Sequence, residues 1–134
     1  MTVKWRTAFN LNIDIIDSEH QKLIGIINKL YENFKLVDKN ELVKQLLKEL
    51  WDYADVHFKR EEKCFEKYDY PETDKHKEQH HVFMNKIKEV ENDFLNGKIN
   101  LFDQTFFLNK WFANHILVED KKYAKYFENN NLQF

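Results

Sequence analysis

Residues 40–68 read NELVKQLLKELWDYADVHFKREEKCFEKY, a run that places inward-facing residues at every third or fourth position. This spacing is that of one face of an α-helix. The run ends before Tyr70-Pro71, because proline disfavours the helical conformation in the residue that precedes it. The inward face is unusual in holding ionisable side chains among apolar ones. Its members are Leu46, Leu50, Tyr53, His57, Glu61, Cys64 and Tyr68.

Three further stretches of the chain show the same helical spacing. Asp17 or Ser18 is expected to cap the first of them and Thr73 the third, while Asn96-Gly97 is a usual helix-end signal. Four amphipathic helices joined by short connections predict an all-α, up-down-up-down four-helix bundle behind a non-helical N-terminal arm. The predicted segments are the arm at about 1–17 and helices at about 18–36, 40–68, 73–96 and 103–127.

The composition fits one helical domain over residues 1–134. The chain has 2 glycines and 1 proline, so tight turns must be few. Its 21 basic and 23 acidic residues are interleaved, which gives no indication of a nucleic-acid or membrane surface. With no apolar leader after Met1 and a lone Cys64, we expect a soluble cytoplasmic protein without an intrachain disulfide.

Ionisable residues lie on the inward face of all four predicted helices. Five of the 6 histidines are among them, whereas His81 is turned about 100° from His80 and is expected at the surface. Buried ionisable groups need partners, and a shared metal is the simplest one. The candidate ligands are His20, His57, Glu61, His76, His80, His115 and Asp120.

The spacing of these residues is that of metal ligands on helices. His57 and Glu61 are four positions apart, as are His76 and His80, so each pair projects from one helix face. In the third pair, His115 precedes Asp120 by five positions, which corresponds to about 140° around an ideal α-helix. That pair needs either the reach of the aspartate side chain or a local distortion of the helix.

Seven ligands are too many for one ion, so two ions are expected. If each is six-coordinate, the five imidazoles, two bridging carboxylates and one bridging oxide or hydroxide fill all but one of about 12 positions. An open position in an apolar cavity suits a small neutral molecule such as oxygen. Imidazole binds iron, zinc, copper and nickel, so ligand chemistry alone does not choose the metal.

The motifs that carry these residues resemble those of the hemerythrins, in particular the single-domain bacterial members, from Trp5 to about Phe127. All seven ligand positions of that family occur in order. The motifs are DSEHQKL at 17–23, HFKREE at 57–62, YP at 70–71 leading to HKEQH at 76–80, and WFANHI at 111–116 leading to Asp120 and Tyr123.

The resemblance implies that the metals are two iron ions joined by an oxo or hydroxo bridge. By the same resemblance, His76, His80 and His115 complete one iron, and His20 and His57 hold the iron that has the vacant position. It further implies that the pair of irons binds O2 reversibly, as the two ferrous ions transfer two electrons to it.

Glu61 and Asp120 would bridge the two irons, again by resemblance. The protein must also keep the oxygen pocket dry, because water and protons let reduced oxygen leave and strand the irons in the ferric state. Four apolar residues next to ligands in the sequence are expected to line the pocket. They are Phe58, Trp111, Phe112 and Ile116.

Two details of the chain bear on this pocket. The family often has leucine where Phe112 stands, and the larger ring is expected to narrow the pocket or alter the rate at which the irons oxidise. Cys64 follows His57 by seven positions on the same face; we expect it to be a buried small apolar residue, although approach to the metal site stays open.

The function indicated is that of an oxygen carrier, store or delivery protein, not an enzyme. Two alternatives remain at this level: a di-iron enzyme acting on oxygen, peroxide or nitrogen oxides, and an oxygen or iron sensor. The histidine-rich ligand set favours binding, since ferritin-like di-iron sites are richer in carboxylates. The sequence points to molecular oxygen as the ligand and does not identify a protein recipient.

Overall fold

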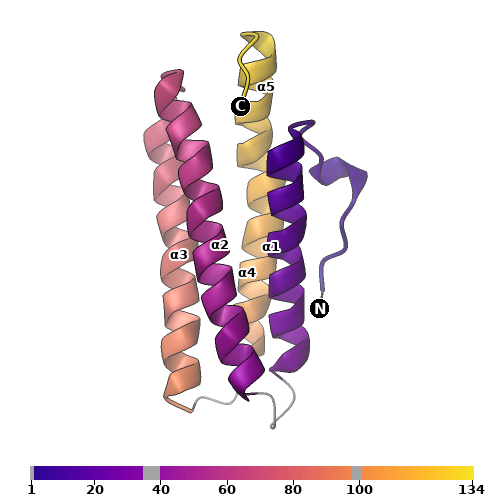
Figure 1. The fold of residues 1–134 in the computed structure, drawn as a ribbon, viewed down its shortest axis with the longest axis vertical. Coiled ribbons are helices and arrows are strands. Elements are labelled where there is room, and N and C mark those ends of the chain that lie inside the picture. Colours follow the sequence, from indigo (N-terminus) through magenta and orange to yellow (C-terminus); the bar gives the residue numbers. More distant parts are fainter. Residues whose placement is uncertain (1, 35–39, 98–100) are drawn as a thin grey trace.

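A computed structural model describes residues 2–34, 40–97 and 101–134. All regular secondary structure of the described residues is helical, with no strand among them, which confirms the all-α prediction. Four long rods stand side by side, and the fourth is built from three consecutive helical segments (Figure 1). The segments are α1 (Asp14–Asn33), α2 (Asn40–Lys67), α3 (Thr73–Leu95), α4 (Phe102–His115), the π-helical η2 (Ile116–Asp120) and α5 (Lys121–Asn129).

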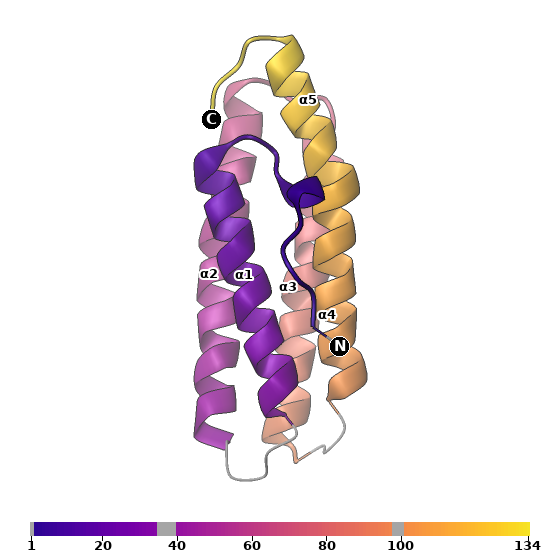
Figure 2. The ribbon, with the colours of Figure 1, turned by 90° about the vertical axis from the view of Figure 1, so that its right-hand side faces the viewer.

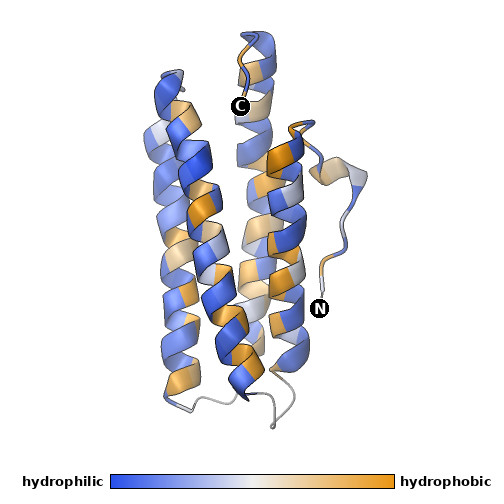
Figure 3. Cartoon of the chain, in the orientation of Figure 1, coloured by the Kyte–Doolittle hydropathy of each residue, from blue (hydrophilic) through white to orange (hydrophobic). Residues whose placement is uncertain are grey.

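The rods form the predicted up-down-up-down bundle. Contacts join α1 to α2, α2 to α3, α3 to α4 and α4 back to α1, so each rod has two neighbours (Figure 2). Apolar and polar residues alternate along each ribbon at helical spacing, and burial of the apolar faces is the main driving force for assembly (Figure 3). Among the described helices, none is both long enough and apolar enough to cross a membrane.

The start of α1 differs from the prediction. The helix begins at Asp14 after Ile13, and no side chain caps it, so neither Asp17 nor Ser18 has the expected role. The Asp17 carboxylate instead accepts hydrogen bonds from the backbone N–H groups of Leu11, at 2.8 Å, and Asn12, at 3.1 Å. A good capping side chain therefore fixes the preceding arm, while its charge still favours the first helical turn. Residues 35–36 of the predicted helix lie outside the described residues.

The ends of α2 and α3 match the sequence signals within a residue. α2 ends at Lys67, one residue before the predicted end. Thr73 is the first residue of α3 and not its cap; its hydroxyl donates to the carbonyl of Tyr70 at 2.6 Å. Gly97 has a φ of 78°, the left-handed conformation that the Asn96-Gly97 signal predicted.

The N-terminal arm is not wholly non-helical, because Thr7–Phe9 form the 3-10 turn η1. Phe9 anchors this turn in the core and packs against the ring of Trp5, with centroids 5.3 Å apart. Nearer the start of the arm, the backbone N–H and C=O of Val3 form hydrogen bonds with the Asn28 side chain, at 3.0 and 2.8 Å. The arm thus lies along the bundle beside α1 and α4 (Figure 2).

The chain after α5 turns back onto the bundle. The backbone N–H of Leu132 donates to the carbonyl of Phe127 at 2.8 Å. The ring of Phe134 lies 5.7 Å from that of Tyr123 and 5.6 Å from that of Phe127. This end of the bundle is therefore closed by aromatic packing.

The apolar interior should dominate the stability of the bundle. Replacing the fully buried Leu50 with alanine is expected to lower the free energy of unfolding by about 2–5 kcal/mol, since it removes buried methyl groups and leaves a cavity. Leu42→Ala is the matched control on the same helix, because Leu42 is 37% exposed, and should change stability by less than about 1 kcal/mol. Urea denaturation of the metal-free protein measures both; equal losses would contradict this account of the core.

Candidate metal centre

Seven ionisable side chains meet in the interior of the bundle, and all are buried. They form three groups, and within each group one ligand atom per residue lies within 4.8 Å of the others. Two groups share no residue, and the third takes members from both and adds an aspartate. The groups are His76, His80 and His115; His20, His57 and Glu61; and Glu61, His76 and Asp120.

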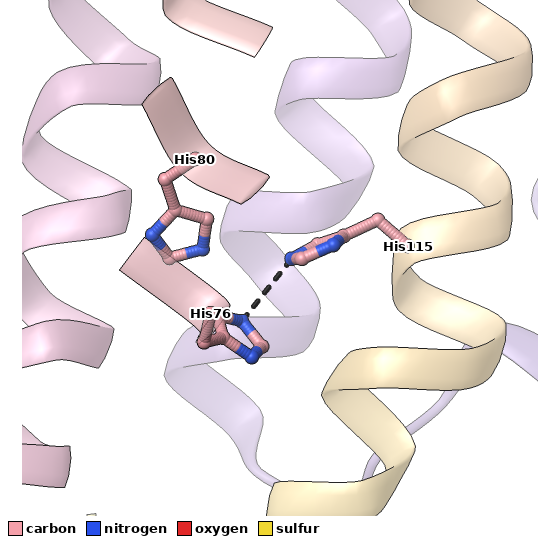
Figure 4. Close-up of side chains that lie close together, drawn as sticks. All are labelled: His76, His80 and His115. Atoms are coloured by element: carbon pink, nitrogen blue, oxygen red, sulfur yellow. Dashed lines mark hydrogen bonds between the residues drawn. The ribbon is translucent and has the colours of Figure 1, made fainter. Parts of the chain in front are cut away.

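The first group is a cluster of three imidazoles from two helices (Figure 4). His76 and His80 lie one turn apart on α3, and His115 reaches them from the end of α4. The Nε2 atoms of His76 and His115 are 3.1 Å apart. Ligand atoms at right angles around one ion, each about 2.1 Å from it, are separated by roughly 3 Å. The pair therefore has the spacing of two ligands of one metal.

The second group brings α1 and α2 together. The rings of His20 and His57 meet edge to face with centroids 4.7 Å apart. Glu61 lies one turn after His57 on α2, and its Oε1 is 3.5 Å from Nε2 of His57. This group has two imidazoles where the first has three, a difference that matters for where a further ligand can bind.

The two carboxylates lie between the groups. Oδ1 of Asp120 is 3.0 Å from Nε2 of His76, and Oδ2 is 3.1 Å from Nε2 of His20. Asp120 thus offers one oxygen to each side. Glu61 offers a single oxygen to both, since its Oε1 is also 3.2 Å from Nε2 of His80. Its Oε2 accepts a hydrogen bond from the Tyr123 hydroxyl at 2.5 Å.

A π-helical segment explains how Asp120 reaches the centre. In an α-helix, Asp120 would point about 140° away from His115. Residues 116–120 form η2, in which hydrogen bonds span five residues, so His115 and Asp120 share a face. Their nearest side-chain atoms are 3.2 Å apart. Of the two ways to bring this pair together, the structure uses the local helix distortion.

The buried polar atoms that face the centre fit a cation. Nε2 of His57, Nε2 of His80 and both oxygens of Asp120 are buried and have no hydrogen-bond partner among the described residues. The same holds for Oε1 of Glu61 and for the ring nitrogens of His20. Leaving such atoms unpartnered is costly, whereas metal ions between the groups would satisfy them together.

Two glutamates that the sequence reasoning did not single out support the histidines from outside. Oε1 of Glu19 lies 3.0 Å from Nδ1 of His57, and Oε2 of Glu62 lies 2.6 Å from Nδ1 of His80. With Nδ1 donating to a carboxylate, each imidazole turns Nε2 toward the centre for a metal. Each glutamate is adjacent in sequence to a candidate ligand, and this adjacency could have identified it as a supporting residue.

The charges of the centre shift its pKa values strongly. Burial and the charge of Asp120 act to raise the pKa of Glu61, but His57 and His80 lower it to about 2. Burial acts to lower the pKa of His80, but the carboxylates of Glu61 and Glu62 next to its two ring nitrogens raise it to about 9. Without metal, His80 thus carries a proton at neutral pH, and metal binding must displace it.

Two further shifts keep neighbouring groups in defined states. Burial would raise the pKa of Asp120, but the imidazoles led by His115 hold it well below its usual value, so it stays an anion. Burial raises the pKa of Tyr123 well above its usual value. Tyr123 therefore remains protonated and keeps donating to Glu61.

Aromatic rings surround the histidines. Phe112 faces the second group, with ring centroids 5.6 Å from His20 and 6.5 Å from His57. Phe58 touches both sides, at 5.6 Å from His57 and stacked on His80 at 3.8 Å.

The remaining expected pocket residues lie differently. Trp111 is only partly buried and stacks on His115, on the side of the first group, with centroids 4.6 Å apart. Ile116 is fully buried at the start of η2. Cys64 is 9% exposed, in agreement with a mostly buried small residue, and His81 is exposed as expected.

The pKa of His80 predicts how the metal-free protein responds to pH. Because folding raises this pKa from 6.5 to about 9, its stabilising effect is full below pH 6.5 and is lost as the pH rises through 9. The free energy of unfolding should fall by on the order of 3 kcal/mol over that range. Glu62→Gln should reduce the fall, while Glu78→Gln, on the exposed face of α3, should not. Urea titrations at each pH test this, and an identical profile for all three proteins would contradict it.

Comparison with known proteins agrees with the geometry. Residues 11–127 match the model of the hemerythrin HHE cation binding domain. The bacteriohemerythrin of Clostridium acetobutylicum is 36% identical, with 89% of this chain and 96% of that protein covered. A hemerythrin-like protein of Naegleria gruberi is 32% identical, with 89% and 88% covered.

Solved structures show the same fold. The crystal structure of a wild-type hemerythrin superposes with a TM-score of 0.84 at 28% identity, covering 93% of this chain and 97% of that one. A leucine-to-phenylalanine variant gives a TM-score of 0.83 at 29% identity, covering 92% and 95%. Because the domain match spans most of the chain and the relatives are similar over nearly their full length, this chain is a member of the hemerythrin family.

Proposed function

We propose that the protein binds molecular oxygen reversibly at a non-haem centre of two iron ions. The observation that carries the proposal is the pair of buried ligand groups, three imidazoles on one side and two on the other, with two anionic carboxylates between them. In such a centre, iron would supply the electrons that bound oxygen accepts reversibly. Family membership supports iron over the other metals that imidazole binds.

The ligands divide between the two ions as the groups do. His76, His80 and His115 would hold one iron, and His20 and His57 the other. Glu61 and Asp120, which face both groups, would bridge them. Since the second group has one imidazole fewer, the open position belongs there.

Phe112 is the residue best placed to shape the oxygen pocket. Its ring is fully buried and faces both histidines of the second group. Phe58 packs beside His57 and would narrow the proposed oxygen pocket on that side. These rings would keep water from the open position, and exclusion of water favours release of oxygen over loss of its reduced form.

The ligand assignment predicts an oxygen-dependent spectrum. The iron-loaded protein should contain two irons per chain and show a visible charge-transfer band that disappears on deoxygenation and returns in air. His57→Ala should abolish the band, because it removes one of two imidazoles at the open side. His81→Ala, which changes the exposed sixth histidine, should keep it. Iron analysis with absorption spectroscopy tests both, and a persistent band in His57→Ala would refute the assignment.

The pocket assignment predicts an effect of ring size. Phe112→Ala should speed oxidation of the oxygenated protein to the ferric state about tenfold or more, since the vacated volume admits water near the open position. Phe106→Ala is the matched control on the same helix, where the ring is 41% exposed, and should leave the rate unchanged. The decay of the oxygenated spectrum gives both rates; unchanged decay in Phe112→Ala would remove this residue from the pocket.

A binding function and an enzymatic one differ in turnover. The oxygenated protein should release its oxygen under vacuum and consume no more than one O2 per centre. Steady consumption of oxygen or peroxide in the presence of a reductant would instead identify a di-iron enzyme. An oxygen electrode makes this measurement directly.

A further inference from the structure

A surface groove of about 590 Å³ lies beside the outer face of α2, apart from the candidate metal centre. Its apolar lining comes from three parts of the chain: Ile15 at the start of α1, Val56 and Cys64 on α2, and Phe134 at the folded-back end. Ile15 is 45% exposed and Val56 55% exposed, so apolar surface is open to solvent here. The groove has the size of sites that take small organic ligands.

The polar lining of the groove is positively charged. Lys59, Arg60, Lys63 and Lys67 all contribute, and no carboxylate side chain of the described residues lines it. The whole chain has a formal charge of −2, so this is a local concentration of positive charge on a slightly acidic protein. Such a surface attracts anions and repels cations.

Arg60 and Lys63 both keep hydrogen-bond donors for a ligand. Arg60 is held by Glu19, whose two oxygens each lie 3.2 Å from Nε, and its terminal amino groups donate to no described residue. Such a guanidinium end is suited to a carboxylate. Lys63 forms no ion pair with any described residue, whereas Lys59 is engaged by Asp55 at 2.9 Å.

We propose that this groove binds a small amphipathic carboxylate, with its anionic group at Arg60 and Lys63 and its hydrocarbon part against Ile15, Val56 and Phe134. The apolar lining argues against a purely hydrophilic anion, which would gain nothing from it. The free end of Arg60, together with Lys63 and Lys67, which form no ion pair with a described residue, argues against a neutral or cationic amphiphile. Glu19 fixes Arg60 in advance, so less side-chain freedom is lost on binding.

Decanoate is a direct probe of the proposal. Titration calorimetry on the metal-free protein, below the micelle concentration of each probe, compares decanoate with decanol and decyltrimethylammonium. Decanoate should bind with one-to-one stoichiometry and at least tenfold more tightly than either. Equal affinity for all three would show unspecific hydrophobic adsorption, and no binding of decanoate would show that the groove is not a ligand site; either result overturns the proposal.

Cys64 reports where the probe binds, because it is the only cysteine in the chain and lies in the groove. Saturating decanoate should slow its alkylation by iodoacetamide at least fivefold, and acetate, which has the charge without the chain, should not. Binding without protection, or equal protection by acetate, would contradict the proposed position.

Charge and apolar variants separate the two parts of the site. Lys63→Glu should weaken decanoate binding about tenfold or more and leave that of decanol unchanged, while Ile15→Gln should weaken both. Lys110→Glu, at an exposed position on α4, is the control with the same charge change and should bind as the parent does. If Lys110→Glu weakens binding as much as Lys63→Glu, general electrostatics and not the groove accounts for the affinity.

Discussion

The rest of this structure depends on burying seven ionisable side chains inside a helical bundle. Their facing atoms are removed from water, and many of them have no hydrogen-bond partner among the described residues. Such an arrangement is unfavourable unless positive ions lie among the imidazoles and carboxylates. The negative charges of Glu61 and Asp120 and the convergent histidine nitrogens are what two such ions require. A helix distortion and two hydrogen-bonding glutamates hold these groups in that position.

Three kinds of feature support the candidate metal centre: a helix distortion, hydrogen bonds to the histidines, and aromatic packing around them. The π-helical turn η2 rotates Asp120 onto the face of His115. Glu19 and Glu62 then fix the ring orientations of His57 and His80. Packed aromatic rings surround the histidines, and Phe112 lies beside the group that has two imidazoles. The proposed reversible oxygen site needs rigidly held ligands and an apolar surrounding, since the metals must keep their positions and the open position must stay dry.

Helix α2 contributes residues both to the candidate metal centre and to the surface groove. Its inward face carries His57 and Glu61, while Lys59 and Lys63 line the basic groove outside. Arg60 lies between them and bonds Glu19, which in turn bonds His57. The groove and the centre therefore share one hydrogen-bonded chain, although their proposed ligands have different chemistry.

The sequence by itself determined the helical class, the number of rods and the seven candidate ligands, because helical periodicity and i, i+4 pairs are local properties. It misplaced the start of α1 and the cap at Thr73, since a capping side chain can bond another segment, as Asp17 does with Leu11. Only the tertiary structure decided how His115 and Asp120 come together and that Glu19 and Glu62 support the histidines. These contacts, like the groove, join segments far apart in the chain or depend on a backbone distortion, and no local pattern specifies which of them the packed bundle will form.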